Sequence, residues 1–249
     1  MKAFILAAGY GKRLAPITDT LPKALVPIQG MPMLEIIINR LRSFGVDEVV
    51  INVHHFAEKI MAYCESRNNF GISVQFSHET DYPLDTGGAI KKASHLLQGE
   101  EPILVHNVDI LTDIDFSRLY NLYNEEEPDV ILAVQDRKTE RYLLLDENNF
   151  LVGWKNVKTN DVKLSMFTDS KIESYAFSGI HLLSPKAIYQ ISTYEEEVFS
   201  ITNYYLEKVE ELSILGYPHN HTFFMDLGKL ENLKFAEYLN LERFYNTGK

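Results

Sequence analysis

Hydrophobic residues in the first half of the chain alternate between short continuous runs and a spacing of three to four positions. Continuous runs are typical of buried strands, whereas the wider spacing predicts amphipathic helices. Strands are expected at residues 3–7, 46–53, 72–77, 102–107 and 129–135. Helices are expected at residues 32–44, 56–66, 88–97 and 116–123, with Gly45 ending the first of them.

This alternation favours right-handed βαβ units and a mostly parallel sheet. Ligands of such sheets bind at the carboxyl ends of the strands. A glycine-containing segment follows residues 3–7, and an acidic turn follows Asn107. Because both segments come directly after strands, we expect them at the same edge of the sheet.

The second half is less regular. Two apolar runs within residues 141–155 flank the turn residues 147–149 and predict a hairpin. A strand is expected at residues 174–185, where Pro185 can begin a helix. Further helices are expected at residues 201–212 and 230–244, and further strands at residues 213–217 and 222–226. No linker, repeat or change of composition divides the chain, so residues 1–249 are predicted to form a single α/β domain with a small β-rich portion.

The composition is that of a globular protein. Hydrophobic residues make up 45% and charged residues 24%, with 14 Tyr and 14 Phe. No apolar run approaches the roughly 20 residues needed to span a bilayer, and the N-terminal run is too short for a signal peptide. A cytoplasmic protein is therefore expected. Cys64 is the only cysteine, which excludes an internal disulfide and a cysteine-based zinc site.

The net charge of −11 makes nucleic acid and anionic membranes poor partners. Against this acidic background, Lys12, Arg13 and Lys23 lie close together in the sequence with Asp19 as the single acid among them. Positive charge of this kind favours an anion site.

The segment around Gly9 and Gly11 fails the tests for two familiar phosphate loops. A dinucleotide fingerprint needs a third glycine where Leu14 stands, and a P-loop needs Ser or Thr where Arg13 stands. What remains is a turn of small residues whose backbone amides could approach a phosphate, followed by a basic pair. A tight turn with basic side chains in solvent explains the same short pattern.

The longer pattern resembles the sugar-1-phosphate nucleotidyltransferases, also called nucleoside-diphosphate-sugar pyrophosphorylases. The signature of that family, L-A-A-G-x-G-x-R-L followed by P-K-[PA]-L-[VL]-P-[VI], is matched by LAAGYGKRL at residues 6–14 and PKALVPI at residues 22–28. The resemblance continues to Asp226. It implies a Rossmann-like fold, the nucleotide-diphospho-sugar transferase fold, with a nucleotide-binding half at about residues 1–115 and a sugar-binding half at about residues 116–249.

The resemblance also implies roles for individual residues. Arg13 would hold the triphosphate, and Lys23 would contact the α-phosphate and the sugar phosphate, so these two residues are the catalytic candidates. The remaining nucleotide-binding candidates are Leu6, Ala7, Ala8, Gly9, Gly11, Lys12, Thr86, Gly87 and Gly88. The glycines near position 87 are expected to expose their amides at the start of a helix.

Two aspartates would bind Mg²⁺, the cofactor that the resemblance implies. Asp109 aligns with the family's G-D turn, although Val108 replaces the glycine. Asp226 lies in FMDLG, which fits the family's W-x-D-[IVL]-G with Phe in place of Trp. Magnesium commonly takes one or two carboxylates together with phosphate oxygens and water. Asp115, which precedes an expected helix, is interpreted as its N-cap.

The sugar-binding candidates are Asp109, Lys155, Glu173 and Gly179. Many relatives carry an E-K-P lysine that contacts the sugar phosphate, and this chain lacks that motif, so Lys155 is its expected substitute. Glu173 would accept hydrogen bonds from sugar hydroxyls, with a solvent-exposed acid as the alternative.

We therefore expect a magnesium-dependent enzyme that converts an NTP and a sugar 1-phosphate into an NDP-sugar and pyrophosphate. The short chain without E-K-P most resembles N-acetylmuramate-1-phosphate uridylyltransferases. Guanylyl transfer to mannose or heptose 1-phosphate, phosphocholine-type cytidylyl transfer and a non-catalytic nucleotide-sugar-binding protein remain alternatives. A monomer or a homodimer is expected.

Overall fold

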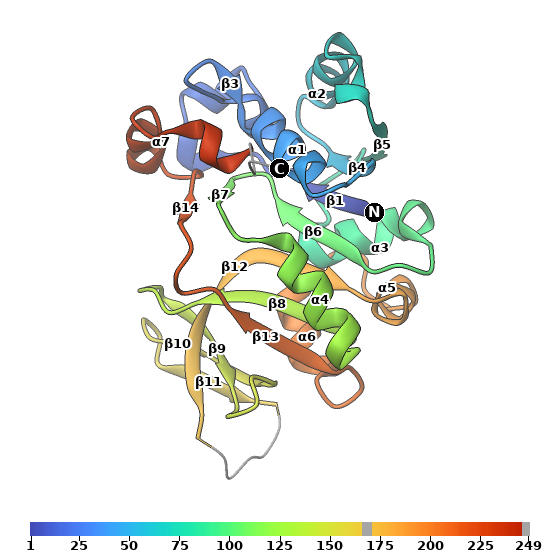
Figure 1. Ribbon diagram of the computed structural model, residues 1–249, viewed down its shortest axis with the longest axis vertical. Coiled ribbons are helices and arrows are strands. Elements are labelled where there is room, and N and C mark those ends of the chain that lie inside the picture. The colour runs from blue at the N-terminus through green and yellow to red at the C-terminus, as the bar shows by residue number, and fades with distance from the viewer. Residues whose placement is uncertain (166–170, 246–249) are drawn as a thin grey trace.

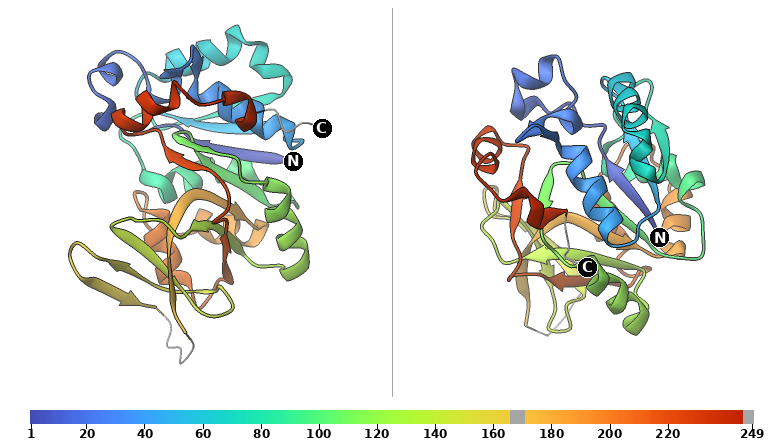
Figure 2. Two further views of the ribbon diagram at one scale, coloured as in Figure 1. Left: turned by 60° about the vertical axis from the view of Figure 1, so that its left-hand side comes forward. Right: turned by 45° about the horizontal axis from the view of Figure 1, so that its top comes forward.

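A ten-stranded sheet runs through the molecule in the order β11-β10-β9-β12-β6-β1-β4-β5, with β8 and β13 joined to it through β12 (Figure 1). The structure is a computed structural model and describes residues 1–165 and 171–245. Helices cover both faces of the sheet, and a small hairpin region projects from one end of it (Figure 2). The architecture is a Rossmann-like α/β fold with a small β-rich portion, as the family resemblance implies.

The N-terminal part of the sheet is parallel: β1 pairs with β4 and β6, and β4 pairs with β5. These strands are β1 (Lys2–Leu6), β4 (Glu48–Val53), β5 (Ser73–His78) and β6 (Ile103–Asn107). Their carboxyl ends therefore share one edge, as the βαβ pattern predicts.

The second part of the sheet is built around the long strand β12, which runs antiparallel to β6, β8 and β9. Strand β13 is parallel to β8, while β10 and β11 extend the hairpin region. These strands are β8 (Val130–Gln135), β9 (Arg141–Leu145), β10 (Leu151–Asn156), β11 (Asp161–Leu164), β12 (Glu173–Leu183) and β13 (Ile214–Pro218).

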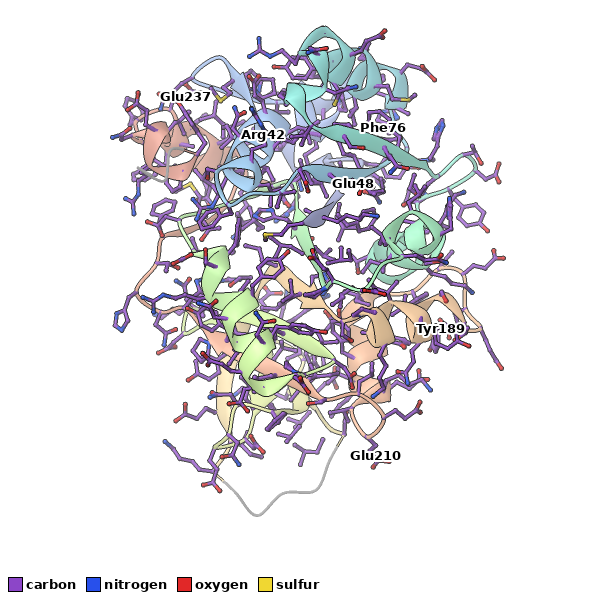
Figure 3. All side chains as sticks on the ribbon, turned by 45° about the vertical axis from the view of Figure 1, so that its right-hand side comes forward. Arg42, Glu48, Phe76, Tyr189, Glu210 and Glu237 are labelled. Atoms are coloured by element: carbon purple, nitrogen blue, oxygen red, sulfur yellow. The ribbon has the colours of Figure 1, made fainter. Side chains whose placement is uncertain are left out.

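Successive side chains of the central strands point to opposite faces of the sheet and pack into two apolar layers. Ala3 and Ile5 of β1 pack toward α1, α2 and α4, whereas Phe4 packs toward α3, α5 and α6. These helices are α1 (Met33–Ser43), α2 (Ala57–Ser66), α3 (Asp85–Leu97), α4 (Phe116–Glu126), α5 (Pro185–Ser192) and α6 (Ile201–Lys208). With all side chains drawn, Tyr189 of α5 and Glu237 beyond α7 lie at the surface on different sides of the molecule (Figure 3).

A third apolar cluster joins the start of the chain to its end. Buried Leu14 packs there with Leu111, Leu227 and Phe244. The elements that contribute are β7 (Ile110–Thr112), β14 (Phe224–Asp226), α7 (Leu230–Ala236) and the 3₁₀ helices η1 (Lys12–Leu14) and η5 (Leu241–Phe244). Gln29, between β2 (Pro27–Ile28) and β3 (Met31–Pro32), donates to the carbonyls of Ala236 and Leu239 at 3.2 and 2.7 Å. The fold thus holds the glycine loop and the C-terminal segment together.

Most of the predicted elements are confirmed, with differences at their ends. The helix expected at residues 230–244 is wrong in its length, because α7 ends at Ala236 and Asn240 caps a separate 3₁₀ helix by accepting from the Glu242 amide. Helix α3 starts at Asp85, before the expected residue 88. The prediction missed β7 and β11, which are short. It also missed the 3₁₀ helices η2 (Ile17–Asp19), η3 (Lys23–Leu25) and η4 (Asn68–Gly71).

Two smaller expectations concern single side chains. Asp115 is the N-cap of α4, as predicted, and accepts from the Ser117 amide at 3.0 Å. Cys64 is a buried free thiol, and burial raises its pKa to about 11. None of the helices in the described part of the chain is long and apolar enough to cross a membrane.

Candidate active site

The glycine loop leaves β1 and divides into a buried and an exposed part. The amides of buried Ala7 and Ala8 donate to Asn52 Oδ1 at 2.5 and 3.2 Å. Gly9 is exposed and lines a cavity. The amides that can meet a phosphate are therefore those from Gly9 onward, while Ala7 and Ala8 support the loop from behind.

Gly11 brings this loop against the lysine of the P-K motif. Its φ is +66°, and a Cβ at this position would lie 2.9 Å from Thr18 Cγ2 and 3.1 Å from Lys23 Cβ. Thr18 Oγ1 also donates to the Gly11 carbonyl at 3.0 Å. A left-handed backbone and close contact both require glycine here, so the loop and Lys23 are fixed relative to each other.

Lys23 forms an ion pair with Asp109, which follows β6 at the same sheet edge. The two side chains are only 15% and 12% exposed, so solvent screens their attraction weakly. Val108 occupies the usual glycine position without displacing Asp109, because its side chain is buried in the core and its amide donates to the Leu6 carbonyl at 3.1 Å.

Asp226 forms the second ion pair, with Arg13 Nη1 at 3.1 Å. Burial works to raise the pKa of Asp226, but the Gly228 amide at 2.8 Å and the charge of Arg13 hold the pKa below its ordinary value. Asp226 is therefore an ionised carboxylate.

Three of these charged groups converge at Gly228, and the fourth, Lys23, is paired with one of them, Asp109. A Cβ on Gly228 would lie 2.8 Å from Asp109 Oδ2, 2.8 Å from Asp226 Oδ1 and 2.7 Å from Arg13 Nη2. In the described residues no group of three or more His, Cys, Asp and Glu could hold a metal ion. Two converging carboxylates nevertheless fit Mg²⁺, because that ion keeps waters and takes substrate phosphates as its other ligands.

Strands β7 and β14 set the distance between the two aspartates. Asp226 is paired with Ile110, the residue after Asp109, and the Leu227 amide donates to the Asp109 carbonyl at 2.7 Å. At the other end of β14, Asp113 accepts from the Phe223 amide at 2.7 Å. These contacts fix the register that brings the carboxylates together.

A cavity of about 250 Å³, here called the nucleotide-side cavity, opens between the glycine loop and α3. It is lined by Leu6, Ala8, Gly9, Lys23, Asn52, Glu79, Pro83, Asp85, Thr86, Asn107, Val108 and Asp109. Five of the predicted nucleotide-binding residues, namely Leu6, Ala8, Gly9, Lys23 and Thr86, therefore face one cavity.

Buried Asn52 and Glu79 support this cavity, and both were missed from the sequence. Asn52 Nδ2 donates to Glu79 Oε1 at 2.7 Å, and Glu79 Oε2 accepts from the Leu84 amide at 2.8 Å. Hydrogen bonds through the Asn52 and Glu79 side chains thus connect the glycine loop to the segment that leads into α3. The position of Asn52 near the end of β4, at the ligand-binding edge, was the available signal.

Gly87 and Gly88 differ from their prediction. Both are buried within α3, and both amides donate to the Phe199 carbonyl, at 2.9 and 3.3 Å. A Cβ on Gly87 would lie 2.2 Å from the Phe199 ring, and one on Gly88 would lie 2.1 Å from the Glu197 carbonyl oxygen. The expected exposed amides are therefore absent at these two residues, whose lack of a side chain lets the segment before α6 pack on α3.

A larger cavity of about 930 Å³, here called the acceptor-side cavity, lies across Asp109 from the first. It is lined by Arg13, Asn107, Asp109, Ile110, Arg137, Lys138, Thr139, Glu140, Arg141, Phe177, Ser178, Gly179, Phe224, Met225, Asp226, Lys229 and Asn232. Gly179 has a φ of +69°, and a Cβ there would lie 2.6 Å from Asn107 Nδ2. Both predicted metal ligands and Gly179 thus line one space.

Lys155 and Glu173 lie elsewhere. The Lys155 ammonium lies 5.4 Å from the centre of the Tyr142 ring, and Glu173 pairs with Lys171 at 2.7 Å and accepts from the Tyr175 hydroxyl at 2.8 Å. Neither residue is among those that line the two cavities. Their predicted sugar contacts remain predictions.

The sequence match that decides the family extends over nearly the whole chain. Residues 2–242 match the family described as nucleotidyl transferase. The chain belongs to this family. Among curated nucleotidyl transferases, the chain is 31% identical over 240 residues to D-glycero-alpha-D-manno-heptose 1-phosphate guanylyltransferase of Aneurinibacillus thermoaerophilus, covering 95% of this chain and 97% of the relative.

Other nucleotidyl transferases match over a smaller share of their length. N-acetylmuramate alpha-1-phosphate uridylyltransferase of Neisseria meningitidis serogroup B is 41% identical over 120 residues, which cover 48% of this chain and 52% of that protein. A UTP--glucose-1-phosphate uridylyltransferase of Synechocystis is 28% identical over 240 residues, which cover 92% of this chain and 61% of that protein.

A solved structure shares the fold. The crystal structure of HddC from Yersinia pseudotuberculosis complexed with GMP-PN superposes with a TM-score of 0.73 at 23% identity, over 95% of this chain and 97% of that one. At this identity the likeness supports the fold alone.

Proposed function

We propose that this nucleotidyl transferase catalyses attack of a sugar 1-phosphate on the α-phosphorus of an NTP, giving an NDP-sugar and pyrophosphate. The observation that carries the proposal is the convergence of two cations, Lys23 and Arg13, with two carboxylates, Asp109 and Asp226, where the two cavities meet. One cavity suits the nucleotide, and the other suits the acceptor.

The chemistry needs positioning and charge rather than a general base. The attacking phosphate oxygen is already ionised at neutral pH, so no side chain has to remove a proton. Negative charge moves to the leaving pyrophosphate, and Lys23 and Arg13 are placed to offset it once the phosphates draw them from their carboxylates. Mg²⁺ held by Asp109 and Asp226 would neutralise phosphate oxygens and help to align them.

For the substrates, we propose UTP and N-acetylmuramate 1-phosphate. The identity to the Neisseria uridylyltransferase and the absence of an E-K-P lysine support this choice. Guanylyl transfer to a heptose or mannose 1-phosphate is the second candidate, because the guanylyltransferase relative matches over almost its whole length.

The remaining alternatives fit the site less well. A choline acceptor calls for an aromatic cage, and the acceptor-side cavity combines two aromatic residues, Phe177 and Phe224, with several cations that would repel choline. A non-catalytic binding protein is the alternative that Val108 allows, because Val108 replaces the family's glycine before Asp109. The buried Val108 side chain leaves Asp109 in the lining of both cavities, which supports the catalytic alternative.

Pyrophosphate release from a panel of NTPs and sugar 1-phosphates in Mg²⁺ tests the proposal. We expect turnover that Asp109→Ala and Asp226→Ala each abolish. If nucleotides bound but no pair gave turnover, the enzymatic function would be rejected. If one of these variants kept a near-normal rate, the substituted aspartate would not be a ligand of the metal ion.

A further inference from the structure

The acceptor-side cavity holds more positive charge than a sugar 1-phosphate requires. Its acids are already paired: Asp109 with Lys23, Asp226 with Arg13, and Glu140 with Lys158 at 3.5 Å. Within the described part of the chain, no ion pair joins the other cations of the lining to an acid. Those cations are Arg137, Lys138, Arg141 and Lys229. A phosphate monoester supplies at most about two negative charges, so four unpaired cations exceed the need.

Arg137 is built into the cavity wall. Its guanidinium lies 4.2 Å from the centre of the Phe224 ring and donates through Nη2 to the Phe177 carbonyl at 2.8 Å. Its buried Nε has no partner in the structure. Phe224 is on β14, two residues before Asp226, so Arg137 lies beside the predicted metal site. An oriented guanidinium at this place is suited to the acceptor's 1-phosphate.

Lys138, on the loop that joins β8 to β9, and Arg141, the first residue of β9, add to the positive charge of the cavity lining. This loop is held by hydrogen bonds from the Thr139 amide to the Tyr142 hydroxyl at 3.2 Å and from the Arg141 amide to Thr139 Oγ1 at 3.4 Å. Residues 137–141 carry three cations and one acid, Glu140, which is paired with Lys158, in a protein whose net charge is −11. The three cations repel one another. An anionic ligand would relieve this repulsion.

We infer that the acceptor is an acidic sugar 1-phosphate, whose second anionic group, a carboxylate or a further phosphate, pairs with Lys138 and Arg141 while Arg137 contacts the 1-phosphate. This inference rests on the proposed function and specifies its acceptor class. N-acetylmuramate 1-phosphate, with its lactyl carboxylate, belongs to that class, whereas mannose 1-phosphate does not.

Acceptors that share a sugar ring and differ only in an acidic group distinguish the effect of the second anion on binding from that of the ring. Calorimetry would measure the Kd of glucose 1-phosphate, glucuronate 1-phosphate and glucose 1,6-bisphosphate with the intact protein, Mg²⁺ and the α,β-methylene analogue of UTP or GTP. N-acetylglucosamine and N-acetylmuramate 1-phosphate form a second pair. In at least one series the acidic member is expected to bind about tenfold more tightly than its neutral parent. Comparison of glucuronate 1-phosphate with glucose 1,6-bisphosphate shows whether a carboxylate or a second phosphate is recognised.

Substitutions then assign the effect to the loop. The double variant Lys138→Gln, Arg141→Gln should bring the ratio of neutral to acidic Kd close to one. Lys163→Gln, which removes an exposed positive charge on β11, should leave the ratio unchanged. Equal Kd values within every series, no binding of any acceptor, or an unchanged ratio in the double variant would overturn the inference.

Turnover distinguishes this inference from the proposed function. An acidic acceptor that binds selectively but gives no pyrophosphate with any NTP would reject the enzymatic function and keep the binding preference. Efficient turnover of neutral acceptors with no gain from an acidic group would keep the function and reject the inference.

Discussion

The ammonium of Lys23 is bound to the carboxylate of Asp109, 86 residues away in the sequence, at the point where the nucleotide-side and acceptor-side cavities meet. Arg13 and Asp226 form a parallel pair next to it. Each cation proposed to bind phosphate is thus matched with a carboxylate proposed to bind Mg²⁺. Binding of the metal–nucleotide complex would exchange these partners.

This exchange predicts that loss of Lys23 separates metal affinity from turnover. In Lys23→Gln no ammonium competes for Asp109, so Mn²⁺ alone should bind about tenfold more tightly, while turnover falls by about 100-fold or more. Asp109→Asn should weaken Mn²⁺ binding. Electron paramagnetic resonance titration measures free Mn²⁺, with Lys163→Gln as the control. Weaker Mn²⁺ binding in Lys23→Gln would contradict competition between the two cations.

The two glycine motifs should respond differently to alanine. A Cβ on Gly9 meets no atom within 4 Å, whereas a Cβ on Gly87 lies 2.2 Å from the Phe199 ring. Gly9→Ala should leave the free energy of unfolding within about 0.5 kcal/mol but raise the KM for NTP about tenfold, because the new methyl group obstructs the phosphate. Gly87→Ala should cost about 2–3 kcal/mol of stability through overpacking.

Urea unfolding and steady-state kinetics measure these two effects. Gly99→Ala is the matched control, since a Cβ there also meets no atom within 4 Å. A Gly9→Ala variant with an unchanged KM would place the triphosphate away from this part of the loop.

Asn52 should contribute to both stability and nucleotide binding. Asn52→Ala leaves the amides of Ala7 and Ala8 and one carboxylate oxygen, Glu79 Oε1, without their partner, and each unsatisfied buried group costs about 1–3 kcal/mol. We expect a loss of at least about 3 kcal/mol in unfolding free energy and an increased KM for NTP. Asn121→Ala, on the exposed face of α4, is the control. If Asn52→Ala kept the wild-type unfolding free energy and the wild-type KM for NTP, Asn52 would not support the glycine loop.

Three buried histidines should make the protein sensitive to mild acid. Burial lowers the pKa of His106 and of His219 to about 4 and that of His181 to about 3, from an ordinary 6.5. As pH falls below about 6.5, the unfolded chain binds protons that the folded chain does not. The free energy of unfolding is therefore fully present above that pH and decreases by about 1.4 kcal/mol per pH unit for each histidine as the pH approaches 4.

Urea unfolding between pH 7.5 and pH 5 measures this slope. His181→Gln should flatten it, whereas His95→Gln, at an exposed position, should not. A stability that stays constant across this range would show that none of the three histidines is kept neutral by the fold.

The sequence predicted the elements whose pattern is local. Apolar runs and helical spacing located β1, β4, β6 and α1 closely, and the rule for strand ends placed Asn107 beside the glycine loop. The long match around Lys23 identified the family because two segments at a fixed distance are rarely matched by chance.

What the sequence could not supply depends on contacts between distant segments. Arg137 is oriented by Phe177 and Phe224, which lie 40 and 87 positions later, and nothing near it in the sequence marks it as part of a site. A glycine at position 87 can be explained by close approach of a ligand or by close packing within the protein. Only the position of Phe199 distinguishes the two explanations. The three-residue strand β7 gave no periodic signal.

The apolar cluster that contains Leu14, Leu111, Leu227 and Phe244 bears on where this protein can be cut or fused. It packs the last described turn, Leu241–Phe244, beneath the glycine loop and beside the residues that follow Asp109 and Asp226. A truncation placed just after Asp226 would keep Arg13, Lys23, Asp109 and Asp226 and remove the scaffold that aligns them. Tags and fusion partners belong beyond Phe244.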